Sequence, residues 1–121
     1  MTESVLKSQV LLACSNGGTR LFRNNTGMGW TGRVIDQTAR QIILEDYRPL
    51  RAGLCTGSSD LIGWTTRGNV AIFTALELKT GRGKLTPEQA AFLENVRAAG
   101  GIGAEVRSVE DAVRALTPPA R

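Results

Sequence analysis

The stretches GSSDLIG at residues 57–63 and LELK at residues 76–79 decide how this chain folds. Each places charged side chains beside apolar residues of high strand propensity, which predicts two buried strands that end in charge. Because side chains alternate between the two faces of a strand, Glu77 and Lys79 share one face and the neighbouring leucines take the other. Two charges on one face of a buried strand end are costly unless they pair or bind a ligand.

The position of Asp60 follows from the hairpin that joins these strands. If the turn makes Thr66 face Asn69, then Asp60 faces Ala75, and antiparallel partners point to the same face of a sheet. Asp60 then lies on the face that carries Glu77. A loop one residue longer would put Asp60 on the opposite face, unless a bulge restores it.

The other elements follow from apolar periodicity and turn residues. Helices are expected over residues 2–15, 86–99 and 108–116, and strands over residues 21–23, 60–65, 70–79 and 102–107. Thr86, Pro87 and Gln89 agree on the start of the middle helix, as N-cap, first helical residue and capping box. Residues 24–29 are rich in turn formers. The signal in residues 32–54 is poor, which leaves short strands or irregular loop.

Strand, helix and strand over residues 70–107 form a candidate crossover unit, right-handed if the strands are parallel. We therefore expect an α/β fold built as one domain over residues 1–121. The last helix should turn four residues inward, namely Val109, Ala112, Val113 and Leu116. The tail at Pro118 and Pro119 should be frayed.

Composition bounds the functional classes. A chain of 121 residues with 41% hydrophobic content suits one compact core. A net charge of +4, with twelve arginines among fifteen cations, favours a polyanionic partner, because a guanidinium binds two phosphate oxygens at once. The absence of histidine excludes Ser-His and Cys-His nucleophilic mechanisms and His-rich metal sites.

Cysteine content and hydropathy indicate the cellular setting. Cys14 and Cys55 are too few and too far apart for a disulfide framework or a zinc site, and each is expected as a small buried residue. No stretch is apolar enough to cross a bilayer, and the first residues do not form a signal peptide. A soluble, cytoplasmic protein is therefore expected.

The charged cluster suits one kind of chemistry. Two carboxylates on one face, Asp60 and Glu77, suit a hard cation such as Mg²⁺ or Mn²⁺, which activates a bound water and polarises a phosphate oxygen. Lys79 would position that water and stabilise the developing negative charge. The plainer interpretation is a turn aspartate with a solvated Glu–Lys pair. Apolar flanks, the hairpin distance and the basic glycine loop at residues 81–84 disfavour it.

These residues resemble a known family. GxxDLIG at residues 57–63, ELKT at residues 77–80 and GKLTPEQ at residues 83–89 are similar to the virus-type replication-repair nuclease (VRR-NUC) domain of the PD-(D/E)XK nuclease superfamily. RNNTG at residues 23–27 and the region around residues 100–112 also fit the pattern, whereas residues 32–54 are not matched. The usual proline before the motif aspartate is absent, since Ser59 stands there.

The resemblance implies a restriction-endonuclease-like fold, with a central mixed sheet flanked by helices. It implies Mg²⁺ or Mn²⁺ held by Asp60 and Glu77, with Lys79 as the third signature residue. Two further site positions match Glu3, as an additional metal ligand, and Gln89. Single-domain members resemble homodimeric nucleases acting on branched DNA such as four-way junctions, and larger members are parts of DNA repair enzymes. Phage, plasmid or bacterial origin fits this resemblance.

Several of these residues have plainer roles open to them. Glu3 suits the positive end of a helix, and Gln89 completes a capping box without any ligand. The candidate DNA contacts are Arg82, Lys84, Arg23, Asn24 and Asn25, any of which could be an ordinary solvated loop residue. The large aromatics Trp30, Trp64 and Phe73 are expected in the core and receive no function.

Three rival interpretations stay open. A non-catalytic nucleic-acid-binding module would keep the basic surface and lose cleavage. A structural or assembly protein would not bind DNA even at low salt. An RNA nuclease would share the same motif, and substrate competition would identify it.

Overall fold

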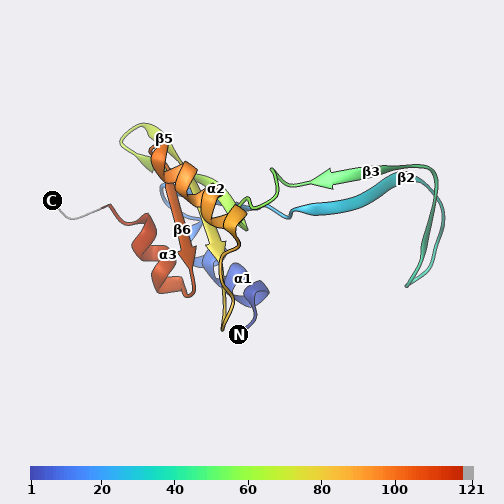
Figure 1. Ribbon diagram of the computed structural model, residues 1–121, viewed down its shortest axis with the longest axis horizontal. Coiled ribbons are helices and arrows are strands. Elements are labelled where there is room, and N and C mark those ends of the chain that lie inside the picture. Colours follow the sequence, from blue (N-terminus) through green and yellow to red (C-terminus); the bar gives the residue numbers. More distant parts are fainter. Residues whose placement is uncertain (119–121) are drawn as a thin grey trace.

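The computed structural model describes residues 1–118 and has an α/β fold (Figure 1). A mixed four-stranded sheet in the order β1-β4-β5-β6 is accompanied by a separate two-stranded sheet, β2-β3. The elements are α1 (Glu3–Cys14), β1 (Thr19–Arg23), β2 (Gly27–Gln37), β3 (Ile42–Ala52), β4 (Leu61–Arg67), β5 (Val70–Leu78), α2 (Pro87–Ala98), β6 (Ile102–Val106) and α3 (Val109–Leu116). The expected helices and the four strands of the main sheet are confirmed within a few residues. Of the tail expected to fray, Pro119 lies outside the described residues.

The hairpin between β4 and β5 turns one residue further along the chain than the turn considered from the sequence. Arg67 pairs with Val70 across a two-residue turn, and Thr66 therefore pairs with Ala71 rather than with Asn69. Gly68 opens the turn with a φ of 65°, which glycine adopts without strain. The register differs from the assumed one by two positions. Because the side-chain period is also two, Asp60 keeps the face that carries Glu77.

One face of the main sheet carries the core. Leu76 and Leu78 of β5 pack with Leu6 and Val10 of α1, and all four are fully buried. Ala112 of α3 joins the same cluster. Thus α1 and α3 cover one face together. Strands β5 and β6 pair in parallel on either side of α2 in the sequence, which confirms the candidate crossover unit.

The opposite face is only half covered. Helix α2 lies over β5 and β6, where a Cβ on Gly103 would come within 2.8 Å of the Leu93 backbone. Over β1, β4 and the first half of β5 the face is open, and Phe22, Trp64 and Phe73 are 50%, 42% and 38% exposed. The expected core positions of Trp64 and Phe73 are therefore wrong, because no helix of the described chain covers that half.

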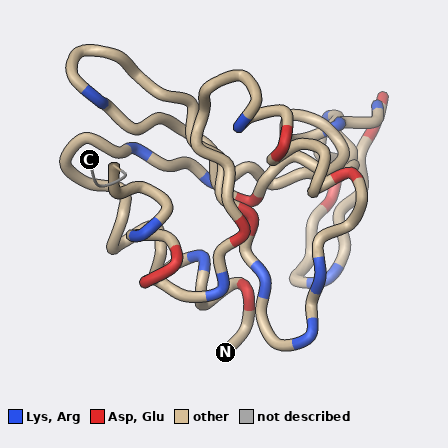
Figure 2. The backbone as a smooth tube through the Cα atoms, turned by 60° about the vertical axis from the view of Figure 1, so that its left-hand side comes forward, with Lys and Arg blue, Asp and Glu red and all other residues tan. Residues whose placement is uncertain are grey.

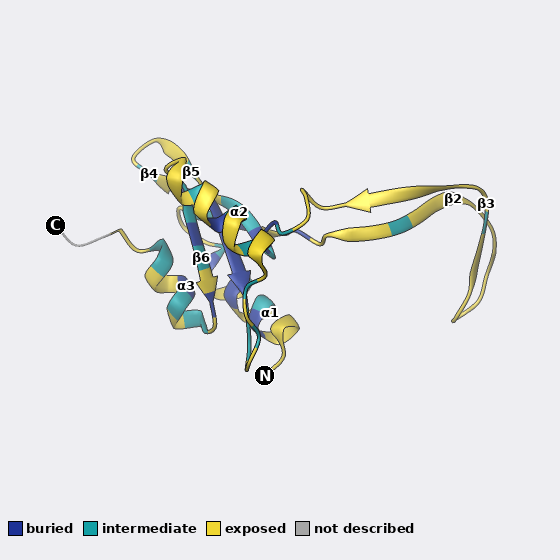
Figure 3. Ribbon diagram, viewed as in Figure 1, coloured by how far each residue is buried: buried dark blue, intermediate teal, exposed yellow. Residues whose placement is uncertain are grey.

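Strands β2 and β3 form a hairpin, here called the arm (residues 27–52), that projects away from the body (Figures 1 and 3). Its strands pair with each other, with bulges near Thr31 and Val34. Its exposed large hydrophobic residues are Met28, Trp30, Val34, Ile35, Ile42, Ile43, Tyr47 and Leu50. Strand signals are weak in these residues because neither face of the arm is buried within the chain, so apolar and polar residues do not alternate.

Two smaller expectations are wrong. Cys14 is buried, but Cys55 is exposed in the segment after the arm. Val113 is 48% exposed, because the inward face of α3 is formed by its neighbours Ala112, Ala115 and Leu116. Lys and Arg are spread over the whole chain rather than gathered on one element (Figure 2). Among residues 1–118, no helix is long and apolar enough to cross a membrane.

Candidate active site

Asp60 and Glu77 meet where β4 begins and β5 ends. Asp60 lies one residue before β4, and its Oδ2 accepts a hydrogen bond of 2.8 Å from the backbone N–H of Leu78. Gly57, with a φ of 85°, lies so close to α2 that a Cβ there would come within 2.6 Å of the Glu88 backbone. The Asp60 loop is therefore held between β5 and the start of α2, as only glycine permits.

The buried side chain of Asn24 holds this loop in place through hydrogen bonds. Its Nδ2 donates to Oγ of Ser58 and to the carbonyl of Ser59, over 2.8 and 2.9 Å, and its Oδ1 accepts from the Leu54 backbone N–H. The residue is only 8% exposed. Its expected place on the substrate surface is therefore corrected, because both ends of its amide are bonded inside the protein.

Glu77 is the most unusual group of the site. It is 2% exposed, and its Oε1 accepts a 3.0 Å hydrogen bond from Nε2 of Gln89. The ammonium of Lys79 lies 3.9 Å from the same oxygen. The second oxygen, Oε2, is buried without a partner among the described residues. A buried carboxylate oxygen without a donor is costly, so it calls for a ligand that supplies positive charge.

The electrostatics agree with that requirement. The pKa of Glu77 is raised from 4.5 to about 8, chiefly by burial and also by the neighbouring Asp60 carboxyl, while Lys79 acts to lower it. Without another cation, one buried lysine does not compensate two carboxylates. The carboxylate pair therefore holds a proton near neutral pH, and a divalent cation would displace that proton.

Gln89 forms the expected capping box and also contacts Glu77. Its side-chain oxygen accepts from the Thr86 backbone N–H over 2.9 Å. The backbone N–H of Gln89 donates to Oγ1 of Thr86, which completes the capping box. Its amide nitrogen remains free to bond Glu77. The cap thus fixes the orientation of the amide at the site.

Glu3 lies beside the loop that follows Lys79. A Cβ on Gly83 would be 3.6 Å from Cδ of Lys79 and 3.9 Å from Oε1 of Glu3. Among residues 1–118, however, no three Asp, Glu, His or Cys side chains are close enough to hold a metal together. The structure therefore brings together Asp60 and Glu77 as a carboxylate pair and leaves Glu3 on the Lys79 side.

The basic loop at residues 81–84 is braced by a residue that the sequence analysis missed. The guanidinium of Arg107 donates to the carbonyls of Gly81 and Gly83. These partners are more than twenty residues away, so no local pattern could indicate them. Arg82 and Lys84 are exposed on this loop.

The second group of candidate DNA contacts is split by the structure. Arg23 and Asn25 are exposed, on either side of the buried Asn24. Nη2 of Arg23 lies 3.3 Å from Oγ of Ser8, and this surface bond is weak enough to exchange for a phosphate oxygen.

Comparison with known proteins identifies the family. The model of the VRR-NUC domain matches residues 15–111, which include Asp60, Glu77, Lys79 and Gln89. Glu3 precedes the matched residues, so its assignment depends on the resemblance alone. No match was found among curated proteins or among solved structures. The convergence of the signature residues and the extent of the match place this chain in the VRR-NUC family of nuclease domains.

Proposed function

We propose that this protein is a Mg²⁺- or Mn²⁺-dependent DNA endonuclease that hydrolyses phosphodiester bonds with Asp60, Glu77 and Lys79. One observation carries the proposal: these side chains converge at one end of β4 and β5 around a buried, unpartnered oxygen of Glu77. A purely structural Glu–Lys pair would leave neither a buried orphan oxygen nor a second carboxylate beside it.

The donor set fits a hard divalent cation. Asp60 and Glu77 offer only oxygen, and Mg²⁺ is commonly bound by one or two carboxylates, with water and substrate phosphate at the other positions. The site lacks the histidines and thiolates that favour zinc. A third carboxylate is therefore not required as a metal ligand, and Glu3 is proposed to contribute to the site from beside Lys79.

Each residue of the site has a separate task. A bound cation would lower the pKa of a water molecule and polarise the scissile phosphate. Lys79, with three donors and no acceptor, holds the attacking water and meets the negative charge that develops on the phosphate. Gln89 binds one oxygen of Glu77, which leaves the other oxygen available to hold a cation. The Leu78 backbone N–H fixes Asp60 in the same way.

The substrate is proposed to be DNA, with a preference for branched forms such as four-way junctions, cut by a homodimer. A two-fold enzyme matches the two-fold symmetry of such a junction. Arg82, Lys84, Arg23 and Asn25 are exposed around the site and are proposed to contact phosphates.

A cleavage screen tests this function. Linear duplex, flap and four-way-junction DNA, with the matching RNAs as competitors, are incubated with Mg²⁺, Mn²⁺ or EDTA. Cation-dependent cutting of DNA that is lost in Asp60→Asn supports the proposal. DNA binding without cutting under any condition would assign a binding module instead. Preferential cutting of RNA would change the substrate class.

A further inference from the structure

The arm exposes a large apolar surface. Its eight large hydrophobic side chains are each 48–65% exposed, which amounts to roughly 800 Å² of apolar surface. These residues lie on both faces of the hairpin, since Trp30 pairs with Pro49 and the next pair is Gly29 with Leu50. Their summed area is comparable to one side of a standard protein interface, which is about 800 Å². An isolated two-stranded hairpin is also marginally stable in water. Both arguments require a partner that covers the arm.

Part of the arm is shaped to receive such a partner. Trp30 and Tyr47 pack edge to face, with ring centroids 5.5 Å apart, and they line an apolar hollow of about 570 Å³ together with Val34 and Leu44. Seven basic and acidic residues nearly balance on the arm, four arginines against three carboxylates. The arm is therefore an apolar surface rather than a phosphate-binding one.

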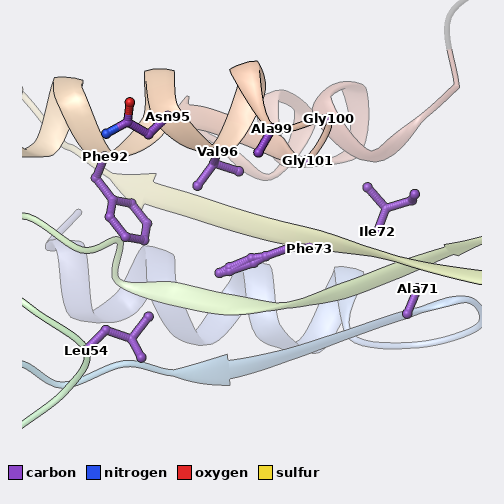
Figure 4. A pocket seen from close by; sticks show the side chains of 10 residues that line it. All are labelled: Leu54, Ala71, Ile72, Phe73, Phe92, Asn95, Val96, Ala99, Gly100 and Gly101. Carbon is purple, nitrogen blue, oxygen red and sulfur yellow. The ribbon is translucent and has the colours of Figure 1, made fainter.

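The body carries a second uncovered apolar surface, here called the aromatic face and defined by Phe22, Ile62, Trp64 and Phe73. Phe22 and Trp64 pack with centroids 5.7 Å apart. Phe73 leads into an apolar hollow of about 540 Å³ between the sheet and α2, lined also by Phe92 and Val96 (Figure 4). A hollow of this kind accommodates one or two large side chains from a partner.

We propose that the arm of one copy of this chain packs on the aromatic face of a second copy, and the reverse, in an exchanged dimer. The arm extends away from its own body, so it cannot cover its own aromatic face (Figure 1). A reciprocal exchange covers both apolar surfaces of both copies with two identical contacts, as two-fold symmetry requires. No foreign protein is needed to cover either surface.

The exchange places the partner beside the cleavage site. Asp60 and Glu77 lie on the same side of the sheet as the aromatic face. Residues an even number of positions apart share a face of a strand, which applies to Asp60, Ile62 and Trp64 and, on β5, to Glu77 and Phe73. Glu77 and Phe73 are four positions apart along β5, a distance of about 13 Å. The partner's arm would therefore lie beside the cleavage site. This inference extends the proposed homodimer by naming its contact.

The main competitor is DNA itself, since exposed aromatics also stack on unpaired bases. The aliphatic composition of the arm and of the hollow beside Phe73 favours protein. Base stacking would leave the arm of each copy uncovered. The experiment below distinguishes base stacking from the exchanged dimer.

Sedimentation equilibrium without DNA or metal separates these outcomes. An arm variant, Trp30→Ser with Tyr47→Ser, and a face variant, Trp64→Ser, should each weaken the dimer. One lost aromatic anchor typically costs roughly 30-fold. The face variant loses one anchor in each of the two contacts, so its dimer should weaken by about 1,000-fold, and the arm variant, which loses two anchors in each contact, should weaken the dimer at least as much. Leu12→Ser, at a residue 85% exposed on α1, is the matched control and should leave the dimer intact.

Mixing the two variants gives the decisive result. An arm-variant chain and a face-variant chain together retain one native contact, so they should form a heterodimer more tightly than either forms a homodimer. Trp64→Ser changes the body and not the arm, so its effect on the dimer can be interpreted even if the arm variant unfolds the hairpin. A monomeric parent, or a dimer weakened by the arm variant alone, overturns the exchange. So does a monomer whose Trp64 fluorescence is quenched by single-stranded DNA. Because no cleavage is measured, a failed exchange leaves the nuclease proposal standing.

Discussion

Nε2 of Gln89 donates to Oε1 of Glu77 over 3.0 Å, while the oxygen of the same amide accepts from the N-cap of its own helix. A local capping box and a distant carboxylate thus share one side chain. The capping box orients the amide, and the amide leaves Oε2 as the one oxygen of Glu77 without a donor among the described residues. Helix α2 therefore takes part in the site through its first turn.

Substitution of Gln89 should separate these two roles. Gln89→Ala should lower the free energy of unfolding by about 1 kcal/mol through loss of the cap. It should also weaken metal binding by about 10- to 100-fold, because Glu77 loses the residue that orients it. Thr86→Ala is the matched control, since it removes the cap without touching Glu77. Equal metal affinity in both variants, measured by calorimetry, would reduce Gln89 to a capping residue.

Lys79 and Glu77 should differ in how their loss affects the enzyme. Lys79→Ala should reduce cleavage by about 100- to 1,000-fold and leave metal binding largely intact, because a protonated lysine is no ligand. Glu77→Ala should lose metal affinity and cleavage together. Calorimetry beside a DNA cleavage time course checks both. A Lys79→Ala variant that cuts at the parent rate contradicts the mechanism.

The metal-free protein should lose stability as pH rises. The folded state raises the pKa of Glu77 from 4.5 to about 8, so it binds more protons than the unfolded chain within that window. The free energy of unfolding should therefore fall from about pH 5 to about pH 8. Glu77→Gln should flatten this slope in denaturant titrations with EDTA. Asp111 provides the opposite control: the Arg107 backbone N–H lowers its pKa, so Asp111→Asn should remove stability that is lost as pH falls. A parent slope equal to that of Glu77→Gln would contradict the raised pKa.

The loop at residues 81–84 should contribute to the salt dependence of DNA binding. Each phosphate contact adds about 0.9 to the slope of log affinity against log salt concentration. Arg82→Ala with Lys84→Ala should therefore lower that slope by about 1.8. Arg114→Ala, in an ion pair with Asp111 on α3, is the control for net charge. An unchanged slope in the loop variant would remove the loop from the interface.

The two serines before Asp60 should respond in opposite directions. Ser59 is fully buried and its hydroxyl has no partner among the described residues, so Ser59→Ala should be neutral or stabilising by up to about 1 kcal/mol. The Ser58 hydroxyl bonds Asn24 and the Cys55 carbonyl, so Ser58→Ala should cost about 1–3 kcal/mol. Thermal unfolding of both variants measures the difference. Destabilisation by Ser59→Ala would mean that its hydroxyl is bonded.

The sequence by itself determined the elements whose burial or capping is local. The α2 cap follows from three residues within one turn, and the second half of β5, residues 74–78, follows from a run that is buried on both faces. The shared face of Asp60 and Glu77 was also predictable, because a two-residue error in register does not change the face. The motif at residues 57–89 indicated the family before any fold was known.

Tertiary structure decided the rest, because its causes are distant in sequence. Asn24 is an internal brace rather than a substrate contact, since its partners are thirty or more residues away. The arm gave no clear pattern because its apolar residues have no partner within the chain. Trp64 and Phe73 are exposed because α2 covers only half of the sheet. Burial is a property of the whole packing, and local sequence constrains it only where the covering element is adjacent in the chain.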